Sequence, residues 1–73
     1  MQTITINGQT LKATKTETRF AQDCIDFIKH DGGKEYAQKH IDIVMRSAPD
    51  DAALQRRKAI ARACGLSDEI KFL

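Results

Sequence analysis

The chain has 73 residues, of which 41% are hydrophobic and 30% are charged, with a formal net charge of +2. This length predicts one small domain, residues 1–73, in which a single core is only just sufficient. The composition excludes a low-complexity chain, and the net charge is too small to imply nucleic-acid binding by itself.

No stretch approaches the length of about 20 apolar residues that a membrane span requires. The first residues lack the apolar core of a secretion signal. Cys24 and Cys64 both fall on apolar helical stripes, which predicts buried, reduced thiols; a disulfide would require the two helices to face each other closely. We therefore expect a cytoplasmic protein that does not associate with membranes.

Residues 2–14 are predicted to form a β-hairpin. Asn7-Gly8 favours a two-residue turn, because both central residues of that turn adopt positive φ. The register that follows has the pairs Gln2–Ala13, Ile4–Leu11 and Ile6–Gln9. One face of this hairpin is apolar, and it must cover helices because a lone hairpin is only marginally stable in water.

Residues 15–31 are predicted to form the first helix. Thr14 and Glu17 have the spacing of a capping box. The core stripe recurs at helical spacing and consists of Phe20, Cys24, Phe27 and Ile28. Gly32-Gly33 is predicted to end the helix and to provide a tight turn.

Residues 34–47 are predicted to form the second helix. Its core stripe consists of Ala37, Ile41, Val44, Met45 and Ala48. Tyr36, His40 and Ile43 widen the apolar surface beyond what one core face needs. These three residues are the candidate protein interface; the alternative is that the hairpin covers them.

Residues 49–64 are predicted to form the third helix, with Ser47 as its cap and Pro49 in its first turn. Gly65 fits the left-handed position after a helix, and Leu66 supplies the apolar contact of that motif. Residues 67–73 are left as a short C-terminal turn or tail.

The third helix carries several cations. Arg57 falls in its apolar stripe, so its head either reaches water or pairs with an acid of a neighbouring element such as Asp42. Arg56 is predicted to face away from that stripe, and Lys58 and Arg62 lie on a further side.

The sequence lacks the patterns of most catalytic and metal sites. Its potential metal ligands, Cys24, His30, His40 and Cys64, lack the paired spacing of structural zinc sites. Neither thiol lies beside a base, and Gly32-Gly33 is not followed by the lysine-hydroxyl pattern of a phosphate loop. We therefore expect no catalytic residues, metal, cofactor or small-molecule substrate.

The segment from Ile60 to Ser67 resembles the middle of a helix-turn-helix of the bacterial repressor type. The matching positions are Ala61, Gly65, Leu66 and Ser67. This resemblance implies DNA binding by an abbreviated motif over Leu54–Leu73. The implied nucleic-acid contacts are Arg56, Lys58, Arg62 and Ser67. Asp68 and Glu69 would then stand where the recognition helix meets DNA, and their carboxylates would repel phosphates.

The sequence therefore predicts an α+β fold in which an N-terminal β-hairpin packs on a bundle of three helices, with a short C-terminal turn or tail. The predicted function is non-enzymatic binding to a larger protein or to a second copy, as a small regulator or inhibitor. In size and make-up the chain resembles the accessory proteins of phages and mobile elements. DNA binding is the alternative.

Overall fold

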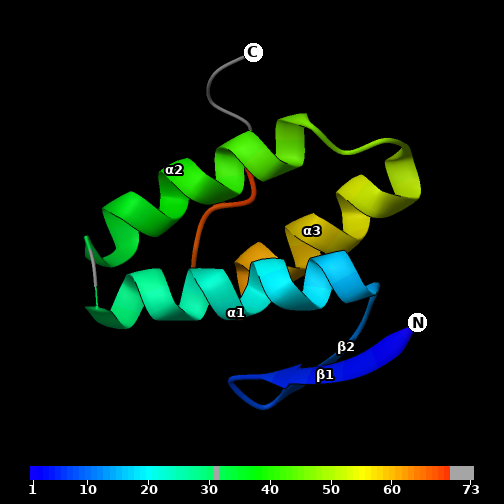
Figure 1. Ribbon diagram of the computed structural model, residues 1–73, viewed down its shortest axis with the longest axis horizontal. Coiled ribbons are helices and arrows are strands. Elements are labelled where there is room, and N and C mark those ends of the chain that lie inside the picture. Colours follow the sequence, from blue (N-terminus) through cyan, green and yellow to red (C-terminus); the bar gives the residue numbers. More distant parts are fainter. Residues whose placement is uncertain (31, 70–73) are drawn as a thin grey trace.

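The structure, a computed structural model, describes residues 1–30 and 32–69 and consists of a hairpin followed by three helices (Figure 1). The elements are β1 (Gln2–Ile6), β2 (Gln9–Ala13), α1 (Lys15–His30), α2 (Gly33–Arg46) and α3 (Asp51–Ala63). The predicted α+β arrangement is confirmed. Residues 66–69 form neither helix nor strand. Asp31 and the remainder of the predicted C-terminal element, residues 70–73, lie outside the described residues.

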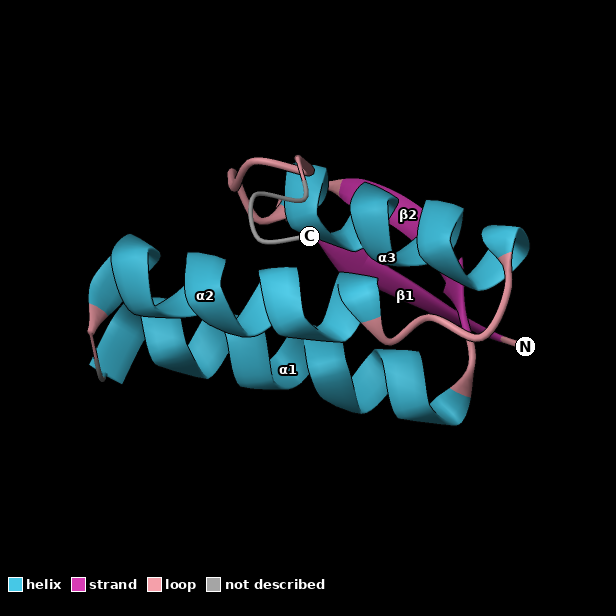
Figure 2. Cartoon of the chain, turned by 90° about the horizontal axis from the view of Figure 1, so that it is seen from above, coloured by secondary structure: helices cyan, strands magenta, loops and turns pink. Residues whose placement is uncertain are grey.

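The hairpin has the predicted turn and register. Asn7 and Gly8 adopt positive φ values of 48° and 83°, which a two-residue turn requires. The strand pairs are Gln2–Ala13, Thr3–Lys12, Ile4–Leu11, Thr5–Thr10 and Ile6–Gln9. Ile6 and Ala13 are buried, so the predicted apolar face covers the helices. The hairpin packs mainly on α1 and α3, and β2 lies beside α3 (Figure 2).

Asn7 also joins the turn to the far end of the chain. Its side-chain Nδ2 donates a hydrogen bond of 2.9 Å to the main-chain oxygen of Ala63, the last residue of α3. The last carbonyls of a helix have no partner within the helix and carry its partial negative charge. One residue therefore serves both the turn and the end of α3.

The predicted capping box is present at the start of α1. The Thr14 main-chain N–H donates to Glu17 Oε1 at 3.0 Å, and the Glu17 N–H donates to Thr14 Oγ1 at 3.2 Å. Unlike most capping-box acids, Glu17 is buried, with only 2% of its surface exposed. A buried carboxylate requires further partners, and α3 supplies one.

The predicted start of α3 was wrong. The helix begins at Asp51, and its N-cap is Asp50, whose side chain accepts a 2.8 Å bond from the Ala53 N–H. Ser47 instead ends α2, and its hydroxyl donates to the Val44 carbonyl at 3.0 Å. Both residues are good caps, but the charge of Asp50 also complements the positive end of α3.

The predicted end of α3 is confirmed. Gly65 has a φ of 79°. Its N–H donates to the Arg62 carbonyl at 3.0 Å, and the Leu66 N–H donates to the Ala61 carbonyl at 2.9 Å. This pair of bonds is the Schellman motif. Leu66 is buried, as that motif favours.

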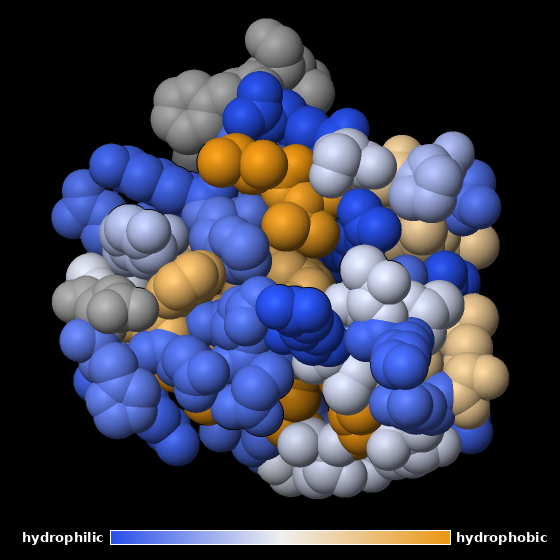
Figure 3. All heavy atoms as spheres, viewed as in Figure 1, coloured by the Kyte–Doolittle hydropathy of each residue, from blue (hydrophilic) through white to orange (hydrophobic). Residues whose placement is uncertain are grey.

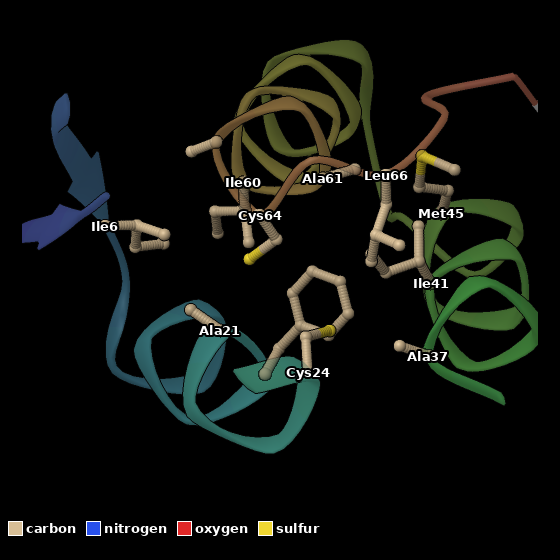
Figure 4. Close-up of a cluster of buried hydrophobic side chains, with 12 residues drawn as sticks. Ile6, Ala21, Cys24, Ala37, Ile41, Met45, Ile60, Ala61, Cys64 and Leu66 are labelled. Atoms are coloured by element: carbon tan, nitrogen blue, oxygen red, sulfur yellow. The ribbon is translucent and has the colours of Figure 1, made fainter. Parts of the chain in front are cut away.

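The core lies between the three helices and is closed on one side by Ile6 of the hairpin (Figure 4). Its largest fully buried side chains are Ile41, Met45, Ile60 and Cys24. Cys24 and Cys64 both point into this cluster and are free thiols. Phe27, which the sequence placed in the core stripe, is only partly buried and lies at the margin of the core.

We expect Asn7→Asp to destabilise the fold more than Asn7→Gly. Both replacements tolerate positive φ, so both keep the turn. The aspartate also places a carboxylate against the Ala63 carbonyl at the negative end of α3. We expect a loss of about 1–2 kcal/mol of unfolding free energy for Asn7→Asp and about half of that for Asn7→Gly, measured by urea denaturation at neutral pH. Equal losses would contradict the capping role.

Candidate functional site

The three predicted interface residues lie together on the outward face of α2. Tyr36 and Ile43 are 50% and 58% exposed, and His40 is half-buried between them. Together with Lys39 they line an open hollow of about 220 Å³. We call these four residues the α2 surface. Lys39 was missed by the sequence analysis because a lysine adds nothing to an apolar stripe.

The hairpin does not cover the α2 surface. Its main contacts are with α1 and α3, and it lies on the far side of α1 from α2 (Figure 1). On the same view of the molecule, apolar atoms interrupt a largely polar surface over α2 (Figure 3). The alternative in which the hairpin buries Tyr36, His40 and Ile43 is therefore wrong, because the predicted hairpin packs on other helices.

Aromatic rings of α1 pack against two residues of the α2 surface. The Phe27 ring meets Tyr36 edge-on with a centroid separation of 4.9 Å, and it meets His40 edge-on at 4.8 Å. The Phe20 ring lies 5.6 Å from His40. Edge-to-face ring pairs contribute about 0.5–1.5 kcal/mol each beyond burial. The Tyr36 and His40 side chains are therefore held in place before any partner binds.

Burial lowers the pKa of His40, and the negative charge of nearby Asp23 opposes this effect only in part. His40 is thus neutral at pH 7, which keeps the hollow free of a buried positive charge. In the turn before α2, Tyr36 requires a glycine at position 32, because a side chain there would collide with the Tyr36 Cβ.

The first nucleic-acid candidate, Arg56, is committed to an internal ion pair. Its Nε donates to Glu17 Oε1 at 2.7 Å, and its Nη2 donates to Glu17 Oε2 at 3.1 Å. The prediction that Arg56 faces away from the core was wrong. A carboxylate buried at the start of α1 needs a cation, and α3 passes close enough to supply this one.

This pairing sets the charge of Glu17. Burial alone would raise the pKa of Glu17, but the hydrogen bonds from Arg56 and from the Thr14 N–H, with the charges of Arg56 and Arg57, lower it below its ordinary 4.5. In turn, the hydrogen bond to Glu17 raises the pKa of Arg56. Both groups remain charged at neutral pH.

The other nucleic-acid candidates are also engaged, in part, within the chain. Arg62 Nη1 forms an exposed ion pair with Asp68 Oδ2 at 2.6 Å, which holds the pKa of Asp68 below its usual value. Ser67 is clamped by Gln38, whose amide donates to the Ser67 carbonyl at 2.8 Å and accepts from the Ser67 N–H at 2.9 Å. Lys58 is half-buried on α3.

The structure gives Arg57 a role that neither sequence alternative included. Its Nη1 donates to the main-chain carbonyl of Val44 at 2.7 Å, near the C-terminal end of α2. This carbonyl also accepts from the Ser47 hydroxyl, and a cation at a helix C-terminus adds a second donor and complements the helix dipole. Asp42 is 3% exposed and lies 3.4 Å from Arg46 on its own helix.

The thiols are poor nucleophiles in this fold. Burial, aided by the neighbouring Cys64 and Asp23, raises the pKa of Cys24 to about 12, and burial also raises the pKa of Cys64. Residues 1–30 and 32–69 contain no group of three histidine, cysteine or acidic side chains placed to hold a metal ion. In the same part of the chain, no helix has both the length and the apolar character needed to cross a membrane.

Comparison with protein-family models, with curated proteins and with solved structures found no match for this chain. The site must therefore be interpreted from its own geometry. The α2 surface is a preorganised, exposed, partly apolar hollow, whereas the cations of α3 are largely occupied by acids and carbonyls of the same chain.

The stability of the fold should depend on pH through Glu17. The fold lowers the pKa of Glu17, so this carboxylate contributes fully to the free energy of unfolding above pH 4.5. That contribution is lost as the pH falls through the pKa that Glu17 has in the folded state. We expect Glu17→Gln to reduce the fall in unfolding free energy measured between about pH 5 and pH 2. Asp68→Asn, which alters an exposed and screened pair, is the control and should change this fall little.

Both thiols should react slowly with a thiol reagent in the folded state, because their raised pKa values leave little thiolate at neutral pH. Cys64 lines a second hollow of about 110 Å³ beside Asn7, so it should react before Cys24. Labelling kinetics followed by mass spectrometry, with the denatured chain as control, tests this order. Rapid labelling of Cys24 would contradict its placement.

Proposed function

We propose that this chain is a non-enzymatic protein-binding module, a small regulator or inhibitor that acts by binding a larger protein through the α2 surface. The observation that carries this proposal is the exposure of Tyr36 and Ile43, with His40 between them, around the hollow of about 220 Å³. Protein interfaces are enriched in aromatic side chains at their centres and tolerate charged residues at their rims. Tyr36 would be the central anchor, and Lys39 would belong to the rim.

Preorganisation supports this assignment. Phe27 contacts both Tyr36 and His40, so the rings lose little conformational freedom when a partner binds. The hollow is open, whereas a small-molecule site buries most of its ligand, and the rings of Tyr36 and His40 together with Ile43 give it a largely apolar lining. An apolar side chain of a partner protein fits this chemistry better than a polar metabolite.

DNA binding by residues 54–73 remains the alternative proposal, because Ala61, Gly65, Leu66 and Ser67 match the helix-turn-helix positions in sequence, although residues 66–69 form no helix. Two interactions weigh against it. Arg56 would have to leave the buried Glu17, and Arg62 would have to exchange Asp68 for a phosphate. The first exchange would leave a carboxylate buried without its cation, which is strongly unfavourable.

The proposal places this activity in the cytoplasm. Both cysteines are free and buried, and a reducing compartment keeps such thiols unpaired. Likewise, the raised pKa values of both thiols support a role in binding rather than in nucleophilic catalysis.

A capture experiment with matched variants tests the protein-binding proposal. The wild-type chain, Ile43→Asp and the control Gln55→Asp are immobilised and exposed to an extract of cells that carry the gene. Ile43 and Gln55 are both exposed helix positions, so neither change should affect folding, which circular dichroism verifies. We expect a partner that the wild type and Gln55→Asp retain and that Ile43→Asp loses at least about tenfold, because a carboxylate in the hollow must be desolvated.

Retention of the same protein by all three baits would place its binding site elsewhere and contradict the proposal. A parallel fluorescence-polarisation titration against mixed-sequence duplex DNA tests the alternative. Binding that weakens steeply with salt and is lost in Lys58→Ala would favour DNA instead, because phosphate contacts release counterions. The Lys58 variant is preferred to Arg56 variants, since it leaves the Glu17 pair intact.

A further inference from the structure

Within residues 1–30 and 32–69, the strand β1 has a hydrogen-bonding partner on one side only. The described part of the chain forms a two-stranded sheet, β1–β2, and the two residues that flank a two-residue turn, Ile6 and Gln9, form a hydrogen-bonded pair. Because hydrogen-bonded and non-bonded pairs alternate, Thr3 and Thr5 belong to non-bonded pairs. Their main-chain N–H and C=O groups therefore point away from β2.

The residues of β1 itself lack two of the usual features that prevent strand pairing, although the Lys12 ammonium of β2 donates to Thr3 Oγ1 at 2.9 Å. The five residues of β1, QTITI, carry no charge and no proline, and Thr3 and Thr5 are exposed. The outer edge of β2 is different, because Lys12 occupies it and α3 packs against that strand. An uncharged edge with outward main-chain groups is a template for another strand.

We propose that the occupant is a second copy of this chain, and that two β1 strands pair antiparallel about a two-fold axis at Ile4. In this register Thr3 of each copy faces Thr5 of the other, and each pair exchanges both N–H···O bonds. Ile4 meets Ile4 of the second copy as a non-bonded pair at the axis. The two hairpins thereby form one four-stranded sheet.

The sequence of the edge favours a second copy over an unrelated strand. Thr3-Ile4-Thr5 reads the same in both directions, so antiparallel pairing with itself places threonine opposite threonine and isoleucine opposite isoleucine. Thr–Thr and β-branched pairs of this kind are favourable across strands. A two-fold interface must be self-complementary, and this uncharged palindrome brings no like charges together.

The register also explains a partly exposed residue. Ile4 belongs to the apolar face of the hairpin, but it is less buried than Ile6 on the same face. Pairing at the axis would bring a second Ile4 side chain against it on that face. The inference does not depend on the proposed protein-binding role of the α2 surface.

Cysteine cross-linking tests the register directly. In a non-bonded antiparallel pair the Cα atoms lie about 4.5 Å apart, within the range that a disulfide spans. We therefore expect Ile4→Cys to form an intermolecular disulfide under mild oxidation. The control Thr3→Cys places its thiol opposite Thr5 instead, out of reach of its own symmetry mate, and should cross-link at least roughly tenfold more slowly. Equal cross-linking rates for the two variants would overturn the proposal.

Sedimentation velocity over a range of concentrations tests the pairing without introduced thiols. Thr5→Pro removes one outward N–H and keeps the bonds within the hairpin, whereas Thr10→Pro makes the same change on the outer edge of β2. We expect the wild type and Thr10→Pro to dimerise as concentration rises, and Thr5→Pro to dimerise at least roughly tenfold more weakly. Circular dichroism confirms that each variant is folded.

The proposal would also be overturned by a wild type that stays monomeric at every concentration, by dimerisation that persists unchanged in Thr5→Pro, or by dimerisation that Ile43→Asp abolishes. The last result would place the contact between copies on the α2 surface instead. A dimer lost in both Thr5→Pro and Thr10→Pro would show that pairing does not use the outer edge of β1 specifically, and it would equally reject the register.

Discussion

The buried carboxylate of Glu17 is the interaction on which the arrangement of elements depends. It accepts from the Thr14 N–H at the junction of β2 and α1, and it pairs with Arg56 of α3 through two hydrogen bonds. Removing one member of a buried pair leaves an uncompensated charge, so the three elements are fixed relative to one another. Arg57, the next residue, joins α3 to α2 through the Val44 carbonyl. Adjacent arginines thus connect α3 to both other helices.

The parts of the fold that the sequence predicts well are those in which one residue's conformational preference decides the outcome. Asn7-Gly8 and Gly65 adopt positive φ, and these positions fix the hairpin register and the end of α3. The start of α3 was predicted less well, because Ser47 and Asp50 are both acceptable caps and lie three residues apart. Local sequence preference does not decide between these two caps. The negative charge of Asp50 at the positive end of the helix dipole favours Asp50.

The candidate site shows a different limit. A helical projection compares the residues of one helix with each other and takes no account of other helices. It therefore could not show that Arg56 faces Glu17, a buried acid 39 positions earlier in the chain. The prediction for Tyr36, His40 and Ile43 identified the residues but left their exposure open. Their exposure depends on which helices the hairpin covers, and that is decided by contacts distant in sequence. The sequence placed Phe27 in the core because its spacing alone does not show how far the neighbouring helices cover it. In the structure Phe27 lies at the margin of the core and its ring contacts Tyr36 of the α2 surface.

The two proposed contact surfaces belong to different parts of the fold, the hairpin and α2, which has a consequence for how they would act together. The hairpin lies on one side of α1 and α2 lies on the other (Figure 1). A dimer paired through β1 would carry two α2 surfaces, one on each copy. Two linked copies of a binding surface raise the apparent affinity for a partner that itself presents two sites, because the second contact becomes intramolecular. A weak edge pairing would then be sufficient, since the partner would itself stabilise the dimer by binding both copies.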